Sequence, residues 1–170
     1  MLDNVLQYFI DNAPESIHRA KYSAARERSI GIGALGFHAY LQRKNVAFES
    51  AMAKSLNNSI FRTIRKGLDD ANQILGKERG EAPDASGTGQ RFSHLMAIAP
   101  NASSSIILGN TSPSVEPWRA NAYRQDTLSG AFLNKNRYLD KVIKKHLSPS
   151  GAPLTPKGEE EYADIWSSVI

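Results

Sequence analysis

Apolar residues recur three or four positions apart over much of the chain, which is the spacing of one face of an α-helix. In the N-terminal stretch these residues are Leu2, Val5, Leu6, Phe9 and Ile10. The pattern stops before Pro14, so it predicts a short amphipathic helix. Two more helices are predicted, one from Glu15 to Ala25 and a glycine-rich one from Ser29 to about Arg43.

The longest helical pattern lies near the middle of the chain. Its apolar positions are Phe48, Met52, Leu56, Ile60, Ile64, Leu68, Ala71 and Leu75. They fall on one face and predict a long helix. Residues 76–91 follow, with several glycines and a proline among polar residues, which indicates an exposed and mobile loop.

The second half of the chain alternates short elements with turns. The apolar run Leu95–Ala99 predicts a buried strand, and Ala102–Leu108 predicts a brief helix that Gly109 closes. Two short strands are expected over residues 120–125 and 127–133, then a helix over 135–146. Prolines and a glycine mark residues 148–156 as a linker before a last helix over 157–169.

Composition and charge leave a soluble globular domain as the simplest class. The chain has 170 residues, 41% hydrophobic and 22% charged, and a formal net charge of +4. The bases are interleaved with acids, so direct nucleic-acid binding is not expected. No apolar run approaches the roughly 18 residues of a membrane span, and the N-terminus lacks the pattern of a signal peptide. A cytoplasmic protein with no membrane contact is therefore predicted.

Cysteine is absent from the sequence. The chain can therefore form no disulfide, no thiolate metal site and no thiol nucleophile. The four histidines share no close spacing with one another or with paired carboxylates, so no metal site is predicted. Three consecutive glutamates, Glu159 to Glu161, suit the first turn of the last helix, where negative charge opposes the helix dipole.

A G-x-G-x-x-G string runs from Gly31 to Gly36. A dinucleotide fingerprint requires a buried strand immediately before such a string and an acidic residue about 20 positions later. Neither accompanies it here, because the preceding residues are polar and the following ones continue a helical pattern. The small residues are better explained by a helix that packs closely against a neighbour.

A second candidate site is the run Pro100-Asn101-Ala102-Ser103-Ser104-Ser105, between the predicted strand and the brief helix. A helix N-terminus after a strand presents unpaired N–H groups, and three hydroxyls add donors for an anion. The run lacks the glycine-rich turn and lysine of a P-loop. A capped helix without a ligand explains the same residues. The residues alone leave both interpretations open.

Three stretches together resemble the large, catalytic subunit of class I ribonucleotide reductase, particularly phage forms. Arg26–His38 is similar to the family's R-x-x-G-x-G-x-x-G helix, and Leu95–Ser105 to the strand and loop that hold the substrate diphosphate. Asn110–Pro117 is similar to the N-x-x-x-x-I-E-P segment downstream. The order and spacing of the three stretches agree with the family.

The resemblance implies an α/β fold, the helix-rich portion of a ten-stranded α/β barrel that is incomplete on its own. Residues 1–147 would belong to the barrel domain, 148–156 to a linker and 157–170 to a terminal helix. The activity implied is reduction of ribonucleoside diphosphates to deoxyribonucleotides for DNA synthesis, by a cysteine thiyl radical. No cofactor is expected on this chain, and a di-metal tyrosyl radical is expected on a small subunit.

The family's catalytic cysteines and its tyrosine pair for radical transfer have no counterpart in this sequence. The chain is therefore expected to be an internal piece of the subunit, inactive alone. Its expected partners are a complementary fragment with the cysteines, the radical-generating small subunit, a thioredoxin- or glutaredoxin-like reductant and a ribonucleoside diphosphate. A truncated noncatalytic remnant or interaction module is the alternative. A basic nucleic-acid binder has only the net charge in its favour.

Site residues follow from the resemblance only where the motifs match. Ala102, Ser103 and Ser104 would present backbone amides to the diphosphate, and the two serine hydroxyls would add hydrogen bonds. Asn101 and Ser105 are second choices. Asn-Ala stands where bacterial relatives have Ser-Glu, so a role for that acidic side chain has no basis here. Arg119 resembles a family arginine near the active site.

Overall fold

The chain forms two compact units, and each is assembled from two separate stretches of sequence. The structure, a computed structural model, describes residues 1–169 except the side chains of Gln125 and Thr127. The first unit contains Met1–Ala34 and Ala51–Pro100, and the second contains Leu35–Ser50 and Asn101–Ile170. The chain therefore passes from one unit to the other three times.

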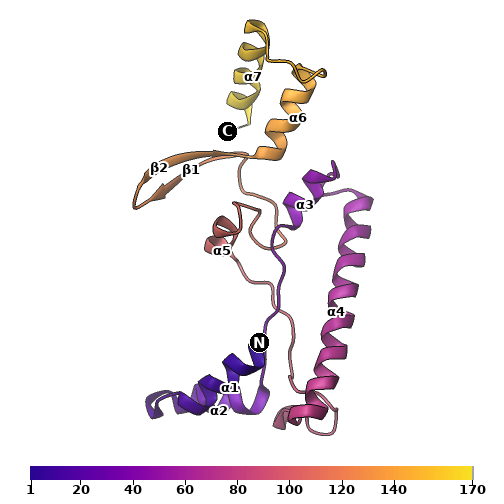
Figure 1. The fold of residues 1–170 in the computed structure, drawn as a ribbon, viewed down its shortest axis with the longest axis vertical. Coiled ribbons are helices and arrows are strands. Elements are labelled where there is room, and N and C mark those ends of the chain that lie inside the picture. Colours follow the sequence, from indigo (N-terminus) through magenta and orange to yellow (C-terminus); the bar gives the residue numbers. More distant parts are fainter. Residues whose placement is uncertain (170) are drawn as a thin grey trace. The chain divides into compact units, whose positions relative to one another are not determined.

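The first unit is mostly helical (Figure 1). Its helices are α1 (Leu2–Asn12), the 3₁₀ helix η1 (Glu15–Ile17), α2 (His18–Glu27), α4 (Ala51–Arg79) and the 3₁₀ helix η2 (Pro83–Ala85). α1 and α2 pack side by side. The helices predicted at the N-terminus and in the middle of the chain are confirmed, although α4 begins and ends a few residues later than its apolar pattern indicates.

A buried carboxylate, Asp3, holds this unit together. Its Oδ1 accepts hydrogen bonds from Arg28 (2.7 Å) and Arg91 (3.0 Å), and its Oδ2 accepts one from Arg79 (2.7 Å). Asp3 is 4% exposed. Burial alone would raise its pKa, but the bonds to the three guanidinium groups outweigh burial and lower the pKa to about 2.

The glycine-rich stretch is extended from Ser29 to Leu35, and the helix predicted from Ser29 to Arg43 is wrong over this part. Ile32 pairs with Met96 in a parallel bridge, supported by bonds from Ile32 N–H to Leu95 O (2.9 Å) and from Ala97 N–H to Ile32 O (3.3 Å). A Cβ on Gly33 would lie 2.5 Å from the Ala97 carbonyl oxygen. The small residues do permit close packing, but of two extended segments.

The buried strand predicted at Leu95–Ala99 pairs only around Met96. Leu95 is buried, whereas Ile98 is 72% exposed. The loop predicted for residues 76–91 is also corrected, because α4 continues to Arg79 and Ala82, Ala85 and Arg91 are buried. An exposed loop is therefore the wrong description of those buried residues.

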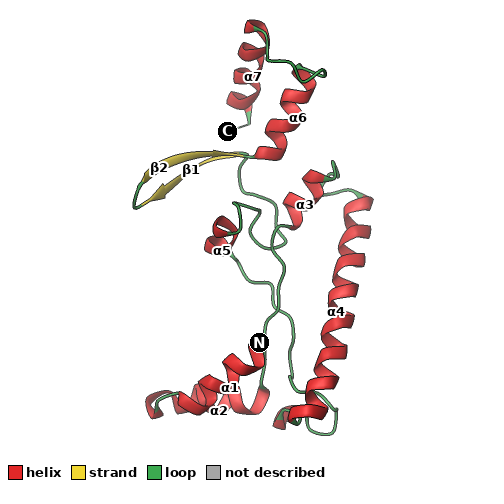
Figure 2. Ribbon diagram, viewed as in Figure 1, coloured by secondary structure: helices red, strands yellow, loops and turns green. Residues whose placement is uncertain are grey.

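The second unit combines helices with one antiparallel hairpin (Figure 2). Its elements are α3 (Phe37–Arg43), α5 (Ala102–Ile107), β1 (Ala122–Thr127), β2 (Gly130–Lys135), α6 (Arg137–Leu147) and α7 (Pro156–Ser168). The hairpin pairs Ala122 with Lys135 through Thr127 with Gly130. The predicted elements are present, but α3 is shorter than expected, and both strands lie two or three residues later than predicted, so Thr127 ends β1 instead of beginning the second strand.

The core of the second unit is formed by Ala122, Ile143 and Trp166, from β1, α6 and α7. The Asn136 side chain caps α6 by accepting from the N–H groups of Tyr138 (3.1 Å) and Leu139 (3.3 Å). The Thr155 hydroxyl caps α7 in the same way at Gly158 (3.2 Å). The proposed division into barrel domain, linker and terminal helix stays a prediction. Within residues 1–169, no helix is both long and apolar enough to cross a membrane.

Candidate functional site

The predicted phosphate loop forms the N-terminal turn of α5. Asn101 occupies the N-cap position, and the first helical bond runs from Ser105 N–H to the Asn101 carbonyl oxygen (2.9 Å). The N–H groups of Ala102, Ser103 and Ser104 therefore precede the helical ladder and remain available to a ligand. All three residues are exposed.

Ser103 and Ser104 differ from Ser105 in what their hydroxyls do. Neither the Ser103 nor the Ser104 hydroxyl forms a hydrogen bond within residues 1–169. Ser105 is 4% exposed, and its hydroxyl donates to the Ala102 carbonyl oxygen (2.8 Å). Its own carbonyl oxygen accepts from Thr111 N–H (3.0 Å). Ser105 therefore stabilises the turn, whereas Ser103 and Ser104 are free to contact a ligand.

The segment after α5 is anchored on α3. Gly36 N–H donates to the Ser112 carbonyl oxygen (2.8 Å), and the Ser112 hydroxyl accepts from Ala39 N–H (3.1 Å). Ser112 is fully buried. Gly36 has a φ of 83°, a backbone conformation that glycine adopts readily. The end of the glycine string and the Asn110–Pro117 segment thus form one structure.

Two further contacts fix the same segment. Trp118 N–H donates to His38 Nδ1 (3.3 Å), and the two rings pack edge to face with centroids 5.6 Å apart. Burial lowers the pKa of His38 and so favours the neutral ring, which has one nitrogen able to accept a hydrogen bond. The Tyr123 hydroxyl donates to Asn110 Oδ1 (2.8 Å). His38 therefore has a structural role, as the partner of Trp118.

Arg119 is exposed and forms no ion pair or side-chain hydrogen bond within residues 1–169. Within residues 1–169, no hydrogen bond joins it to Ser103 or Ser104. Among the described residues there is also no group of three or more His, Asp or Glu side chains that could hold a metal ion. The available chemistry at α5 is anion binding by amides and hydroxyls.

Comparison with known proteins identifies the family. The family described as "Ribonucleotide reductase, barrel domain" matches residues 1–88 and 83–152. The large subunit of ribonucleoside-diphosphate reductase from Invertebrate iridescent virus 6 is 55% identical over 100% of this chain, which covers 17% of that protein. The chain belongs to the ribonucleotide reductase barrel-domain family. The corresponding large subunit of Invertebrate iridescent virus 3 is 58% identical over 99% of this chain and 25% of that protein.

A solved structure shows that the similarity extends to the fold. The class Id ribonucleotide reductase alpha subunit of Actinobacillus ureae matches with a TM-score of 0.79 and 37% identity, over 98% of this chain and 29% of that one. The predicted class, a helix-rich and incomplete portion of the ribonucleotide reductase barrel, is confirmed. The viral character of the resemblance is confirmed too, through iridescent viruses. This chain spans less than a third of each of these three relatives.

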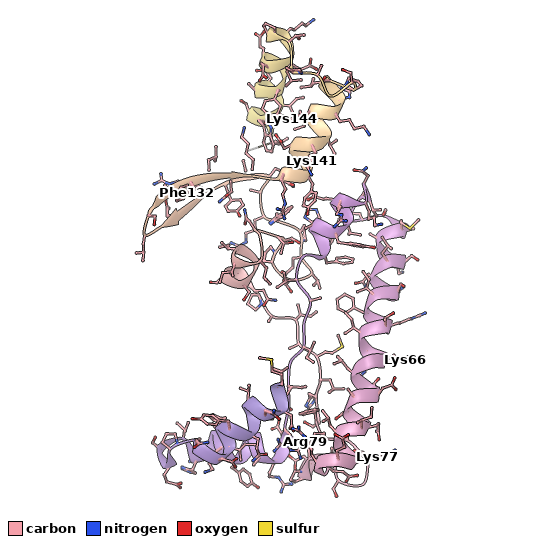
Figure 3. All side chains as sticks on the ribbon, viewed as in Figure 1. Lys66, Lys77, Arg79, Phe132, Lys141 and Lys144 are labelled. Atoms are coloured by element: carbon pink, nitrogen blue, oxygen red, sulfur yellow. The ribbon has the colours of Figure 1, made fainter. Side chains whose placement is uncertain are left out.

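Sequence reasoning missed a group of basic residues in the second unit. Arg137, Lys141 and Lys145 recur every four residues along α6 and line a groove together with Arg43 at the end of α3. Figure 3 marks Lys141 on α6 beside Lys144. The regular spacing was visible in the sequence. The other wall of the groove, on α3, was not, because nearly a hundred positions separate the two helices in the numbering.

Proposed function

We propose that this chain is the part of a ribonucleoside-diphosphate reductase large subunit that holds the diphosphate of its substrate. Ala102, Ser103 and Ser104 supply the amides, and the hydroxyls of Ser103 and Ser104 add hydrogen bonds. The observation that carries the proposal is that these donors are exposed and unused by α5, within a chain of this family.

The anchoring of α5 supports the proposal. An anion site requires donors that hold their geometry before the ligand arrives, because ordering them on binding costs free energy. Ser105 closes the turn from inside, and the Asn110–Trp118 segment is bonded to α3 and β1. The positive end of the backbone dipoles at this turn also favours an anion. Asn101 and Ser105 serve the turn, and Arg119 is a further candidate for contact with the same ligand.

The catalytic groups would come from other polypeptides. With no cysteine, the chain has no group that can carry a thiyl radical or reduce the ribose. A complementary stretch of large subunit would supply the cysteines, and a small subunit with a di-metal tyrosyl radical would generate the radical. A thioredoxin- or glutaredoxin-like protein would regenerate the thiols. The assembly would work in the cytoplasm, which is the host cytoplasm for a virus-encoded protein.

Exposed apolar side chains agree with an incomplete barrel. Ile98 of the first unit is 72% exposed, and Ile107 of α5 in the second unit is 82% exposed. Large apolar side chains that face solvent in each unit suit surfaces that another chain covers. These residues therefore favour assembly with further large-subunit sequence over an independent interaction module.

Reconstitution tests the proposal directly. The chain is mixed with the complementary large-subunit fragment and the small subunit, and deoxynucleotide formation from ribonucleoside diphosphate is measured. Activity is expected only when all components are present. Absence of activity under every reconstitution, with the folded fragments bound to one another, would leave the noncatalytic remnant as the better account.

A double substitution tests the residues. In the reconstituted enzyme, Ser103→Ala/Ser104→Ala removes two hydrogen bonds worth about 1 kcal/mol each, so the KM for the diphosphate is expected to rise by roughly 30-fold. Ser55→Ala, on an exposed face of α4, is the matched control and leaves KM unchanged. An unchanged KM in the double variant would remove both hydroxyls from the site.

A further inference from the structure

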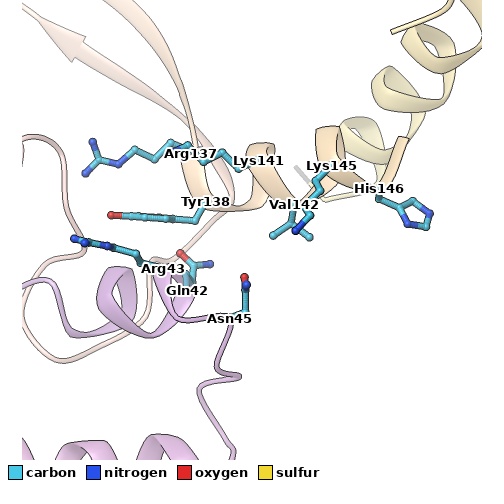
Figure 4. Close-up of a pocket in the computed structure, with 9 residues that line it drawn as sticks. All are labelled: Gln42, Arg43, Asn45, Arg137, Tyr138, Lys141, Val142, Lys145 and His146. Atoms are coloured by element: carbon cyan, nitrogen blue, oxygen red, sulfur yellow. The ribbon is translucent and has the colours of Figure 1, made fainter. Parts of the chain in front are cut away.

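A basic groove lies between the end of α3 and one face of α6, with a volume of about 950 Å³ (Figure 4). Four exposed cations line it: Arg43, Arg137, Lys141 and Lys145. No carboxylate is among its lining residues. The groove belongs entirely to the second unit and does not include the residues proposed to hold the substrate diphosphate.

The four cations have no anionic partner within residues 1–169. By contrast Lys144, on the adjacent face of α6, pairs with Asp140 at 2.9 Å. The helix dipole explains cations in the last turn of α6, but it disfavours one in the first turn, where Arg137 lies. Mutual repulsion of four unpaired cations is relieved when an anion enters the groove.

Polar and apolar groups complete the lining. Figure 4 shows the Asn45 side chain directed toward Val142 and Lys145, while Arg43, Tyr138 and Arg137 extend in one direction. Asn45 offers an amide to a backbone, and Val142 offers an apolar contact. His146 points away from these side chains. The lining therefore suits a polymer that carries negative charges and whose backbone can form a hydrogen bond with Asn45.

The spacing of the cations indicates the form of that ligand. Residues four apart on a helix rise by about 6 Å, so Arg137, Lys141 and Lys145 form a row with that repeat. Alternate side chains of an extended peptide lie about 6.7 Å apart on one side. Carboxylates at alternate positions of such a peptide would therefore meet successive cations.

A single-stranded nucleic acid has a similar charge but needs free aromatic faces for stacking. The one aromatic residue of the groove, Tyr138, is already engaged: it stacks on Trp118 with ring centroids 6.1 Å apart, and the Arg137 guanidinium lies 5.3 Å from its ring centre. The groove thus offers charge and hydrogen bonds without a stacking platform, which favours a peptide.

We propose that this groove binds an extended acidic segment of a partner polypeptide, with carboxylates at alternate positions facing Arg137, Lys141 and Lys145. Arg43 closes the opposite side. This is a docking surface separate from the substrate site, and it does not depend on the diphosphate proposal.

A labelled peptide of alternating glutamate and threonine is the probe, and its fluorescence anisotropy is measured with the 170-residue chain at low and physiological salt. Binding is expected to weaken as salt rises. The variant Lys141→Glu/Lys145→Glu is expected to lose at least about tenfold in affinity, because attraction becomes repulsion at two positions. Lys141→Arg/Lys145→Arg keeps the charge and is expected to retain binding.

The control is Lys54→Glu/Lys77→Glu, which makes the same charge change at exposed positions of α4 and is expected to stay within about twofold of the wild type. Equal losses in both charge-reversed variants would reduce the effect to net charge and overturn the proposal. Absence of peptide binding, or tighter groove-dependent binding of labelled oligothymidylate, would overturn it too. So would self-association, measured by sedimentation, that the groove variant alone abolishes, since a second copy would then be the occupant. Circular dichroism verifies that every variant keeps its helices.

Discussion

Asp3 joins three parts of the first unit through charge. Its guanidinium partners come from the residue after α2, the last residue of α4 and the segment that leads to Met96. Removing this carboxylate is costly, because the Arg28 and Arg91 guanidinium groups would stay buried without an anionic partner. The contribution of Asp3 therefore depends on its being ionised.

The stability of the chain is expected to depend on Asp3 at low pH. Its folded pKa of about 2 lies below the ordinary value of 3.8, so the folded state favours the ionised form. The stabilisation, about 2 kcal/mol, is fully present above pH 4 and is lost as the pH falls through about 2. Urea unfolding measured between pH 6 and pH 2 checks this. Asp3→Asn should be less stable at neutral pH by about 3 kcal/mol and show a shallower pH dependence. If the free energy of unfolding of Asp3→Asn depended on pH as steeply as that of the wild type, other carboxylates would be the cause of the dependence.

A second residue-scale prediction concerns a glycine inside α4. A Cβ on Gly76 would lie 1.9 Å from the Gly89 carbonyl oxygen, which is backbone and cannot move aside cheaply. Gly76→Ala is expected to destabilise the chain by about 2 kcal/mol despite the better helix propensity of alanine. Gly67 lies in the same helix with no atom near its missing Cβ. Gly67→Ala should therefore stabilise by about 1 kcal/mol, as measured by thermal or urea unfolding. If both variants gained stability, the close approach of Gly76 to Gly89 would not exist in solution.

At the scale of elements, α7 depends on its contact with α6. Trp166 is 2% exposed, and the Tyr162 hydroxyl donates to Asp140 of α6 (2.5 Å). The Lys135 ammonium lies 4.8 Å from the centre of the Trp166 ring and 5.3 Å from that of Tyr162. A 13-residue helix is marginal by itself in water, so this packing accounts for most of its stability.

Trp166→Ala is expected to release α7 while leaving the first unit folded. The substitution removes the largest side chain of this core and should cost about 3 to 5 kcal/mol locally. Hydrogen exchange measured by mass spectrometry should increase over Pro156–Ser168 and remain unchanged over α1 and α2. Tyr162→Phe is the milder comparison, with a cost of about 1 kcal/mol for one hydrogen bond. Uniform exchange across the whole chain would show that the two units unfold together.

The elements also show what could be predicted from the sequence. α4 and α6 were predicted correctly, because their apolar residues repeat at the helical period over several turns. Ser29–Leu35 was assigned to a helix in error: Ile30 and Ile32 alternate with glycines, but their pairing partner at Met96 is distant in the sequence and leaves no local pattern. The Asp3 cluster could not be predicted either. An aspartate in the first turn of a helix is commonly exposed, and nothing in the local sequence distinguishes that case from burial.

The candidate site was predictable to a similar degree. The three hydroxyls after a strand indicated an anion site, and family resemblance selected it over a plain capped helix. Pattern alone could not separate Ser105 from its neighbours, because the difference is burial. The bonds that join Ala39 and His38 of α3 to Ser112 and Trp118 were likewise hidden, because the partners lie 73 and 80 positions apart in the sequence.

At the scale of the whole molecule, the two units interleave along the sequence. A single cut between Pro100 and Asn101 would separate α3 from the other elements of the second unit. The segment 101–170 would then lack the groups that bond Ser112 and Trp118. A split of a longer subunit at this point would therefore lose these bonds unless the two fragments associate again.

The parallel pairing of Ile32 with Met96 sets a limit on how fast the first unit can form. The pair closes a loop that contains all of α3 and α4. Loop-closure entropy must be overcome before the few hydrogen bonds of the pair are gained, and folding slows as contacts become more distant in sequence. During synthesis, the extended glycine segment cannot pair until the chain has been extended past Ala97. The helices, whose contacts are local, are expected to form before this long-range pair.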